Sequence, residues 1–147
     1  MGWSYGFDPN LKRDVGYGVP AICDQPGCTT EIDRGLGYVC GGEPFGGDHG
    51  CGLMFCSEHL IYDSVPVDPD LMDEPKGGRL GGRAVHIEGG KLCITVQRCE
   101  RCCAGLDPFK PKPDVEEWIR FKLTDESWQE WRDENPDEVR RMEAAFP

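Results

Sequence analysis

The sequence predicts a small α+β fold that is rich in loops, with one β-hairpin and a helical C-terminal tail. Its 147 residues include 20 glycines and 12 prolines, and the mean hydropathy is −0.52, so we expect a thin apolar core. Nine cysteines are far above ordinary usage and indicate that cross-links or metal ions stabilise the fold. A glycine pair at positions 89 and 90, and helix-start signals after residue 113, indicate the regular elements.

The first 21 residues are expected to form an irregular N-terminal arm. Trp3, Tyr5, Phe7 and Tyr17 are scattered among glycines and follow no clear period. The arm has no basic run, apolar stretch or small-residue cleavage site, and no segment of the chain approaches the roughly 20 apolar residues of a membrane helix. We therefore expect a cytoplasmic protein without membrane contact. A reducing compartment favours metal ligation by the cysteines over disulfides.

Residues 22–105 are expected to form a metal-binding module, because eight of their cysteine and histidine residues fall into four pairs. The pairs are Cys23 with Cys28, Cys40 with Cys51, Cys56 with His59, and Cys99 with Cys102. Two residues that are close in the chain can reach one ion from a tight turn, and a tetrahedral site then takes a second pair from elsewhere. Four pairs predict two closed sites of four ligands each, which is typical of structural zinc.

Two further features are expected inside this module. Residues 63–82 are acidic and rich in proline and glycine, so they should have little regular structure. Residues 83–97 should form a hairpin around Gly89 and Gly90, since glycines suit the positive φ angles of a two-residue turn. The expected cross-strand partners are Glu88 with Lys91, Ile87 with Leu92, His86 with Cys93, and Val85 with Ile94.

The tail, residues 106–147, is expected to be helical in three pieces. Asp114 is a suitable N-cap for a helix over residues 115–122, Thr124 opens a second piece, and Asn135 precedes a proline at the start of the third. The tail contains three tryptophans, Trp118, Trp128 and Trp131. We expect them to pack the tail onto the metal module. The alternative is an exposed stripe that binds a partner.

The run from Cys51 to His59 reads Cys-Gly-Leu-Met-Phe-Cys-Ser-Glu-His and is similar to the core of AN1-type zinc fingers. The upstream spacing, Cys23-x4-Cys28-x11-Cys40, also fits that family. More broadly, the order of pairs resembles cross-brace zinc modules of the treble-clef and RING type. The chain departs from AN1 fingers in two ways, by ten residues between Cys40 and Cys51 and by a last pair that comes 40 residues after His59.

The cross-brace resemblance implies that the first and third pairs share one zinc ion and that the second and fourth pairs share the other. The first site would comprise Cys23, Cys28, Cys56 and His59, and the second Cys40, Cys51, Cys99 and Cys102. Sequential pairing stays open as an alternative. His49 is an alternative ligand in the second pair, although a solvated loop histidine is commoner. Cys103 follows a ligand and is either a substitute ligand or, by preference, a spare thiol.

The expected function is protein–protein interaction, as an adaptor or inhibitor, because closed zinc sites stabilise folds and leave no open position for catalysis. A formal net charge of −11 disfavours nucleic acid as a partner, since that binding depends on clustered lysine and arginine. A nucleic-acid-associated zinc finger is the first alternative. A thiol-dependent enzyme using His86 and Cys93, or a ubiquitin-ligase-like role, is the second. The composition also suggests a bacterial or phage protein.

Overall fold

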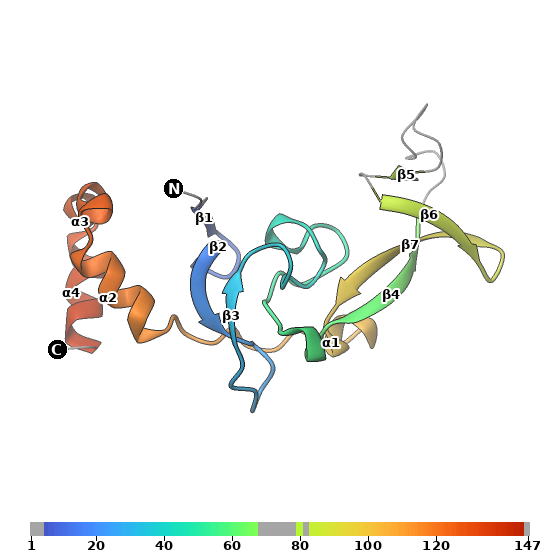
Figure 1. Cartoon of the computed structure of the whole chain (residues 1–147), viewed down its shortest axis with the longest axis horizontal. Coiled ribbons are helices and arrows are strands. Elements are labelled where there is room, and N and C mark those ends of the chain that lie inside the picture. The colour runs from blue at the N-terminus through green and yellow to red at the C-terminus, as the bar shows by residue number, and fades with distance from the viewer. Residues whose placement is uncertain (1–4, 68–78, 81–82, 146–147) are drawn as a thin grey trace.

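The computed structural model describes residues 5–67, 79–80 and 83–145, which form an α+β fold with two antiparallel sheets (Figure 1). The first sheet has the order β1-β2-β3, with β1 (Tyr5–Asp8), β2 (Arg13–Ile22) and β3 (Glu31–Arg34). The second has the order β4-β7-β6-β5, with β4 (Ile61–Pro66), β5 (Arg79–Leu80), β6 (Arg83–Glu88) and β7 (Lys91–Arg98).

Four α-helices follow the second sheet in the chain. They are α1 (Glu100–Cys103), α2 (Glu116–Thr124), α3 (Gln129–Glu134) and α4 (Pro136–Ala145). Short 3-10 turns form at Pro44–Gly46, Ser57–His59 and Glu126–Trp128. In Figure 1 the molecule is elongated, with α2, α3 and α4 at one end, the second sheet at the other, and the first sheet and its loops between them.

The N-terminal segment forms strands, so the expectation of an irregular arm is wrong for residues 5–21. β1 pairs with β2 across a turn in which the Asp8 carboxylate accepts hydrogen bonds from the backbone nitrogens of Asn10 and Leu11. The register of β2 against β3 then shifts between Gly16 and Pro20. Glycine and proline at this bulge hide the two-residue period in the sequence. Residues 1–4, including Trp3, lie outside the described residues.

The hairpin that the glycine pair predicts is confirmed. β6 and β7 pair with the expected register, Val85 with Ile94, His86 with Cys93, Ile87 with Leu92, and Glu88 with Lys91. β4 pairs with the other edge of β7 and buries Val65 against Ile94 and Val96. The expectation of little regular structure in the acidic segment 63–82 is wrong at its two ends, because β4 extends to Pro66 and β5 spans Arg79–Leu80. Residues 68–78 and 81–82 lie outside the described part of the chain.

The main hydrophobic core is small and is formed by residues of β2 and β3, by Cys23 after β2, by the segment between β3 and β4, and by Cys99 after β7. It consists of ten buried residues, Ala21, Cys23, Ile32, Val39, Cys40, Leu53, Met54, Phe55, Cys56 and Cys99. Four of the ten are cysteines that the sequence identifies as candidate ligands. The core and the candidate metal sites are therefore the same part of the molecule.

The tail forms three helices, as expected, but the first of them begins differently. α2 begins at Glu116, and Val115 precedes it without a side-chain cap. The Asp114 carboxylate, expected as the N-cap, instead accepts a hydrogen bond from the Arg34 guanidinium at 2.6 Å. Arg34 is 2 % exposed, and a buried guanidinium requires a charged partner. Asp114 therefore pairs with Arg34 and does not cap α2.

The second helical piece also starts one residue later than expected. Thr124 ends α2, and its hydroxyl donates to the Arg120 carbonyl at 2.7 Å. Asp125 caps the following turn by accepting a hydrogen bond from the Ser127 backbone nitrogen at 2.9 Å. Pro136 is the first residue of α4, in agreement with the sequence prediction.

Lys122 of α2 attaches the tail to the first sheet. Its ammonium lies 2.7 Å from the Asp14 carboxylate, and both side chains are less than a tenth exposed. The same ammonium lies 4.2 Å from the ring centroid of Trp131 and 4.9 Å from that of Trp128. Trp118 donates its indole N–H to Asp14 at 3.0 Å. The three tryptophans therefore surround a buried ion pair, which supports their packing role.

Replacement of Lys122 by methionine is expected to destabilise the protein by about 3 kcal/mol, because it leaves the Asp14 carboxylate buried without its cation. Urea unfolding followed by tryptophan fluorescence measures this change. Lys110→Met is the matched control, since Lys110 is exposed and has the same side-chain type. Equal stability of the two variants would show that the ion pair does not hold the tail.

Candidate metal centres

The first cluster joins the end of β2 to the turn before β4. Cys23, Cys28, Cys56 and His59 each offer one ligand atom, and these four atoms all lie within 4.8 Å of one another. The Cys56 Sγ lies 3.2 Å from His59 Nδ1 and 3.9 Å from Cys28 Sγ. Cys23 Sγ lies 3.6 Å from the same imidazole nitrogen. Three thiols and one imidazole at these separations can hold one metal ion.

Two short turns position the ligands of this cluster. Cys28 donates its backbone N–H to the Gln25 carbonyl at 3.0 Å, and Gly27 between them has φ 84°, which glycine adopts without strain. His59 closes a second turn by donating its backbone N–H to the Cys56 carbonyl at 2.9 Å. The Cys56 backbone N–H points at Cys23 Sγ, 3.2 Å away. Amide donors to sulfur of this kind stabilise thiolates.

The second cluster joins the loop after β3 to the end of β7. Cys40, Cys51, Cys99 and Cys102 also place their four sulfur atoms within 4.8 Å of one another. Cys99 immediately precedes α1, Cys102 lies within it, and the Cys99 backbone N–H points at Cys40 Sγ, 3.2 Å away. The two clusters thus share the same local design. In each, the first cysteine of the later pair, Cys56 or Cys99, directs its backbone N–H at the sulfur of the first cysteine of the earlier pair, Cys23 or Cys40.

Glycines allow the long spacing between Cys40 and Cys51. The loop folds back on itself, so that Gly50 lies against the backbone of Cys40 and a β-carbon at Gly50 would collide with the Cys40 carbonyl. Gly41 and Gly46 have φ angles of 108° and 95°, which other residues rarely adopt. The ten-residue spacing therefore forms a compact loop that brings both cysteines to one point.

The pairs are interleaved along the chain. The first and third pairs form one cluster, and the second and fourth form the other, as the cross-brace resemblance implies. Sequential pairing does not occur in the described structure. His49 and Cys103 belong to neither group of ligand atoms within the described ranges. Cys103 is half-buried, and burial raises the pKa of its thiol.

Burial and hydrogen bonds between neighbouring thiols move the pKa values of several candidate ligands in opposite directions. In the second cluster, hydrogen bonds from Cys51 and Cys99 lower the pKa of Cys40 to about 2, while the same interaction with Cys40 raises the pKa of Cys51. Burial raises the pKa of Cys102 to about 12 and that of Cys23, in the first cluster, to about 11. Ionisation of Cys40 is thus favoured, while ionisation of Cys51 and Cys102 is disfavoured. A divalent cation would reverse this by stabilising every thiolate at once.

A buried carboxylate that no local sequence pattern indicates supports the first cluster. Asp24 follows Cys23 and is 1 % exposed. It forms a two-pronged ion pair with the Arg13 guanidinium, at 2.6 and 3.1 Å, and accepts the backbone N–H groups of Met54 at 2.8 Å and Lys112 at 2.9 Å. The sequence shows that Asp24 follows a candidate ligand, but it does not show which residues bind Asp24, because they are distant in the chain.

The remaining chemical candidate, His86 with Cys93, is not joined by a hydrogen bond among the described residues. His86 Nε2 lies 3.2 Å from Ser64 Oγ and 3.2 Å from Glu88 Oε2. The buried Cys93 thiol faces the Lys91 carbonyl at 3.6 Å. The two residues pair across the hairpin backbone, yet their side chains make separate contacts. Their arrangement gives no support to a nucleophile–base pair.

No family model matches the chain, and neither the curated proteins nor the solved structures contain a match. Among the described residues, no helix is both long and apolar enough to cross a bilayer. Any conclusion about function therefore depends on the two clusters and on the surface around them.

Replacement of Cys51 by serine is expected to remove one bound metal ion per chain, because a serine hydroxyl is a poor ligand and three thiols do not close the second site. Native mass spectrometry of protein purified without added metal measures the ion count. Cys103→Ser is the matched control, since this neighbouring half-buried thiol belongs to neither cluster. Loss of metal from the control, or full retention in Cys51→Ser, would contradict the assignment.

Proposed function

We propose that this protein is a non-catalytic protein-binding module, an adaptor or inhibitor, whose fold depends on two structural zinc ions. One observation carries the proposal. Each cluster supplies four protein ligand atoms within 4.8 Å of one another, so each can close a tetrahedral shell. A closed shell leaves no position for water or substrate. The metal then stabilises the fold, and function is left to the surface.

The chemistry of the ligands supports zinc as the metal. One cluster has three thiols and an imidazole, and the other has four thiols, which are the two commonest closed donor sets for zinc. The interleaved order is that of cross-brace modules, to which we assign the chain on this basis. None of the nine cysteines forms a disulfide. Free thiols in this number suit a reducing compartment such as the cytoplasm.

The charge of the loaded protein supports a protein partner over nucleic acid. Two zinc ions contribute +4 and seven thiolates −7, so metal binding would change the formal net charge from −11 to about −14. Several of the cations are also engaged in internal ion pairs, among them Arg13, Arg34 and Lys122. These buried cations are not available to contact phosphates, and phosphate contacts provide most nucleic-acid affinity.

Removal of metal is expected to unfold the whole module cooperatively, because the candidate ligands form four of the ten residues of the main core. Titration with a zinc chelator, followed by circular dichroism and elemental analysis, measures structure and metal content together. Two zinc ions per chain, lost together with structure, are the expected result. A folded protein that holds no metal would contradict the proposal.

The binding role is tested by capture of partners from a cell extract by the zinc-loaded protein, with the chelated protein as control. A specific protein recovered only by the loaded form is the expected result. Recovery of nucleic acid, with affinity that falls steeply with salt, would favour the alternative class.

A further inference from the structure

A cavity of about 490 Å³ lies between the β1–β2 hairpin and the helical tail. Its lining comes from β1, from the turn and the first residues of β2, and from the tail between Asp114 and α4. None of the eight candidate metal ligands lines it. Small-molecule sites usually have volumes of roughly 300–1,000 Å³. The cavity is therefore large enough for a small organic ligand.

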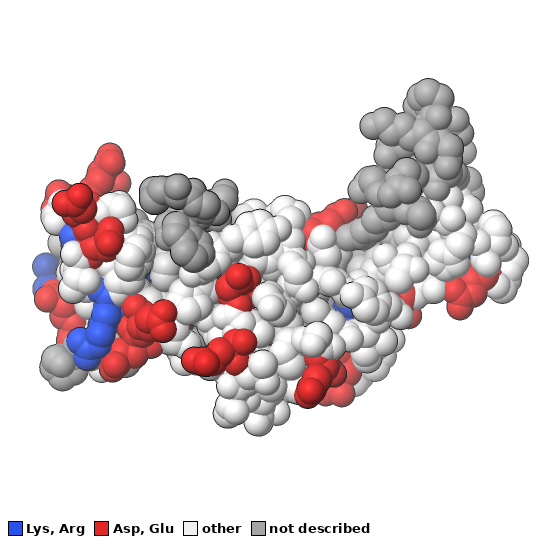
Figure 2. Space-filling model, in the orientation of Figure 1, with Lys and Arg blue, Asp and Glu red and all other residues white. Residues whose placement is uncertain are grey.

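Cations outnumber anions in the lining of this cavity. The cations are Lys12, Arg13, Lys122 and Arg141, and the anions are Asp14, Asp114 and Glu138. The chain as a whole has a formal net charge of −11, so a positive excess is a local property of this place. On the face shown in Figure 2, lysine and arginine gather mainly at the end that carries the helices, whereas acidic residues occur along its whole length. A positive cavity in an acidic chain favours an anionic ligand.

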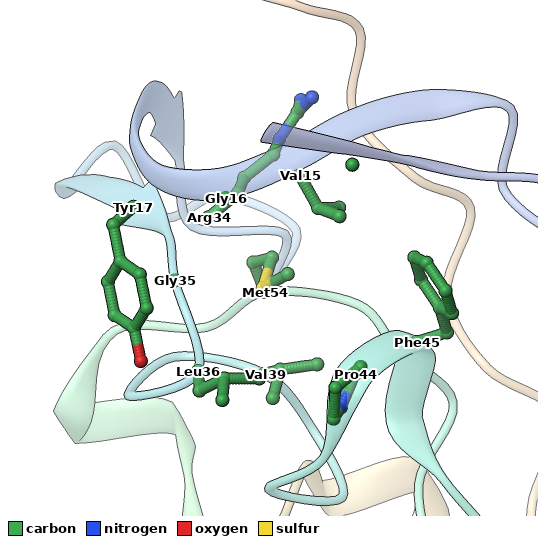
Figure 3. Close-up of a pocket in the computed structure, with 11 residues that line it drawn as sticks. Val15, Gly16, Tyr17, Arg34, Gly35, Leu36, Val39, Pro44, Phe45 and Met54 are labelled. Atoms are coloured by element: carbon green, nitrogen blue, oxygen red, sulfur yellow. The ribbon is translucent and has the colours of Figure 1, made fainter. Parts of the chain in front are cut away.

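Two of the three anions in the lining are neutralised by buried cations. Asp14 pairs with Lys122. Asp114 pairs with Arg34 at 2.6 Å, and Arg34 lines a separate apolar pocket of about 240 Å³ (Figure 3). Figure 3 shows the Arg34 guanidinium pointing away from Leu36, on the wall of that pocket. Neither carboxylate is therefore left to repel an anion in the larger cavity.

Lys12 and Arg141 are the two cations that a ligand in the cavity can use. Lys12 is exposed, and no hydrogen bond or ion pair engages its side chain in the part of the chain that the structure describes. Arg141 pairs with Glu138 at 3.1 Å, and these side chains are 74 % and 44 % exposed. An exposed pair one helical turn apart is weak, so Arg141 can turn to a ligand at little cost.

The rest of the wall is mainly apolar and aromatic. Phe7, Trp131 and Met142 contribute to it, and Phe7 is 58 % exposed. Asn135 also lines the cavity, and its side-chain amide donates to the Trp131 carbonyl at 2.8 Å. This bond fixes the amide and leaves its oxygen available as an acceptor. Aromatic surface, a fixed acceptor and nearby cations suit a planar ring that bears an N–H group and a negative charge.

We propose that this cavity binds a small aromatic anion, a planar ring that carries a carboxylate or a phosphate. The ring lies against Phe7, Trp131 and Met142, and the anionic group faces Lys12 and Arg141. The inference goes beyond the proposed protein-binding function and does not depend on it. Aromatic carboxylates and nucleoside monophosphates share this chemistry, and the experiment distinguishes these two sources.

Two variants remove one cation each and preserve the fold. Lys12 has φ 55°, which glycine adopts without strain, so Lys12→Gly is expected to keep or raise thermal stability. Lys12→Arg keeps the charge and is expected to retain binding. Arg141→Gln loses only a weak exposed pair. Arg140→Gln is its matched control, because Arg140 is 69 % exposed, pairs with Asp137 in the same helix and lies outside the lining.

The experiment is isothermal titration calorimetry of the full chain with indoleacetate and with adenosine monophosphate. Indole, adenosine, acetate and inorganic phosphate are titrated as the corresponding fragments. At least one aromatic anion is expected to bind about tenfold more tightly than either of its fragments. Its affinity is expected to fall about tenfold in Lys12→Gly and in Arg141→Gln, to fall with salt, and to stay unchanged in Arg140→Gln.

Tighter binding of indoleacetate would identify carboxylates as the ligand class, and tighter binding of adenosine monophosphate would identify nucleotides. Three results would overturn the inference. They are binding of neither aromatic anion, binding of a fragment as tight as that of the whole anion, and equal affinity in Lys12→Gly, Arg141→Gln and the unmodified protein. None of the three bears on a protein partner, which capture from a cell extract tests separately.

Discussion

The interleaved order of the two Cys/His clusters is the constraint on which the rest of the structure depends. Because the pairs alternate, the chain passes from one cluster to the other and back. It leaves the first cluster after Cys28, enters the second at Cys40, and returns from Cys51 to the first at Cys56. Neither set of ligands can separate without moving the other. Four ligand cysteines also belong to the main core, together with only six other residues. Metal bound at both clusters would supply the stability that the thin apolar core does not.

Buried ion pairs extend this framework to the tail. The Asp24 carboxylate, next to a ligand, binds Arg13 of β2 and the backbone at Lys112, while Asp14 of β2 binds Lys122 of α2. Both carboxylates are almost fully buried, and each requires its cation. The tail is therefore attached at two points, at Lys112 before α2 and at Lys122 within it. This arrangement explains how a tail with few apolar residues takes a defined position.

The sequence predicts local features well, because each depends on residues that are close in the chain. The Gly89-Gly90 hairpin and the proline start of α4 are of this kind, and the same short spacings identified the ligand pairs. Long-range charge pairing is not visible in the sequence. Asp114 was expected to cap α2, but the buried Arg34, 80 residues away, binds it instead. The strands before residue 22 were missed because a bulge at Gly16 to Pro20 breaks their alternation. The apolar pocket has no local signal at all.

The interleaved order also has a consequence for synthesis on the ribosome. The last ligand of the first cluster is His59, whereas the last ligand of the second is Cys102, 43 residues later. Cys102 follows Cys51 by 51 residues, so at about 5–20 residues per second Cys40 and Cys51 wait roughly 3–10 s until their partners are made. During that interval the nascent chain carries two unprotected thiols in a glycine-rich loop. Metal binding at the second cluster would then depend on the supply of metal and on the redox state of the cell during that interval.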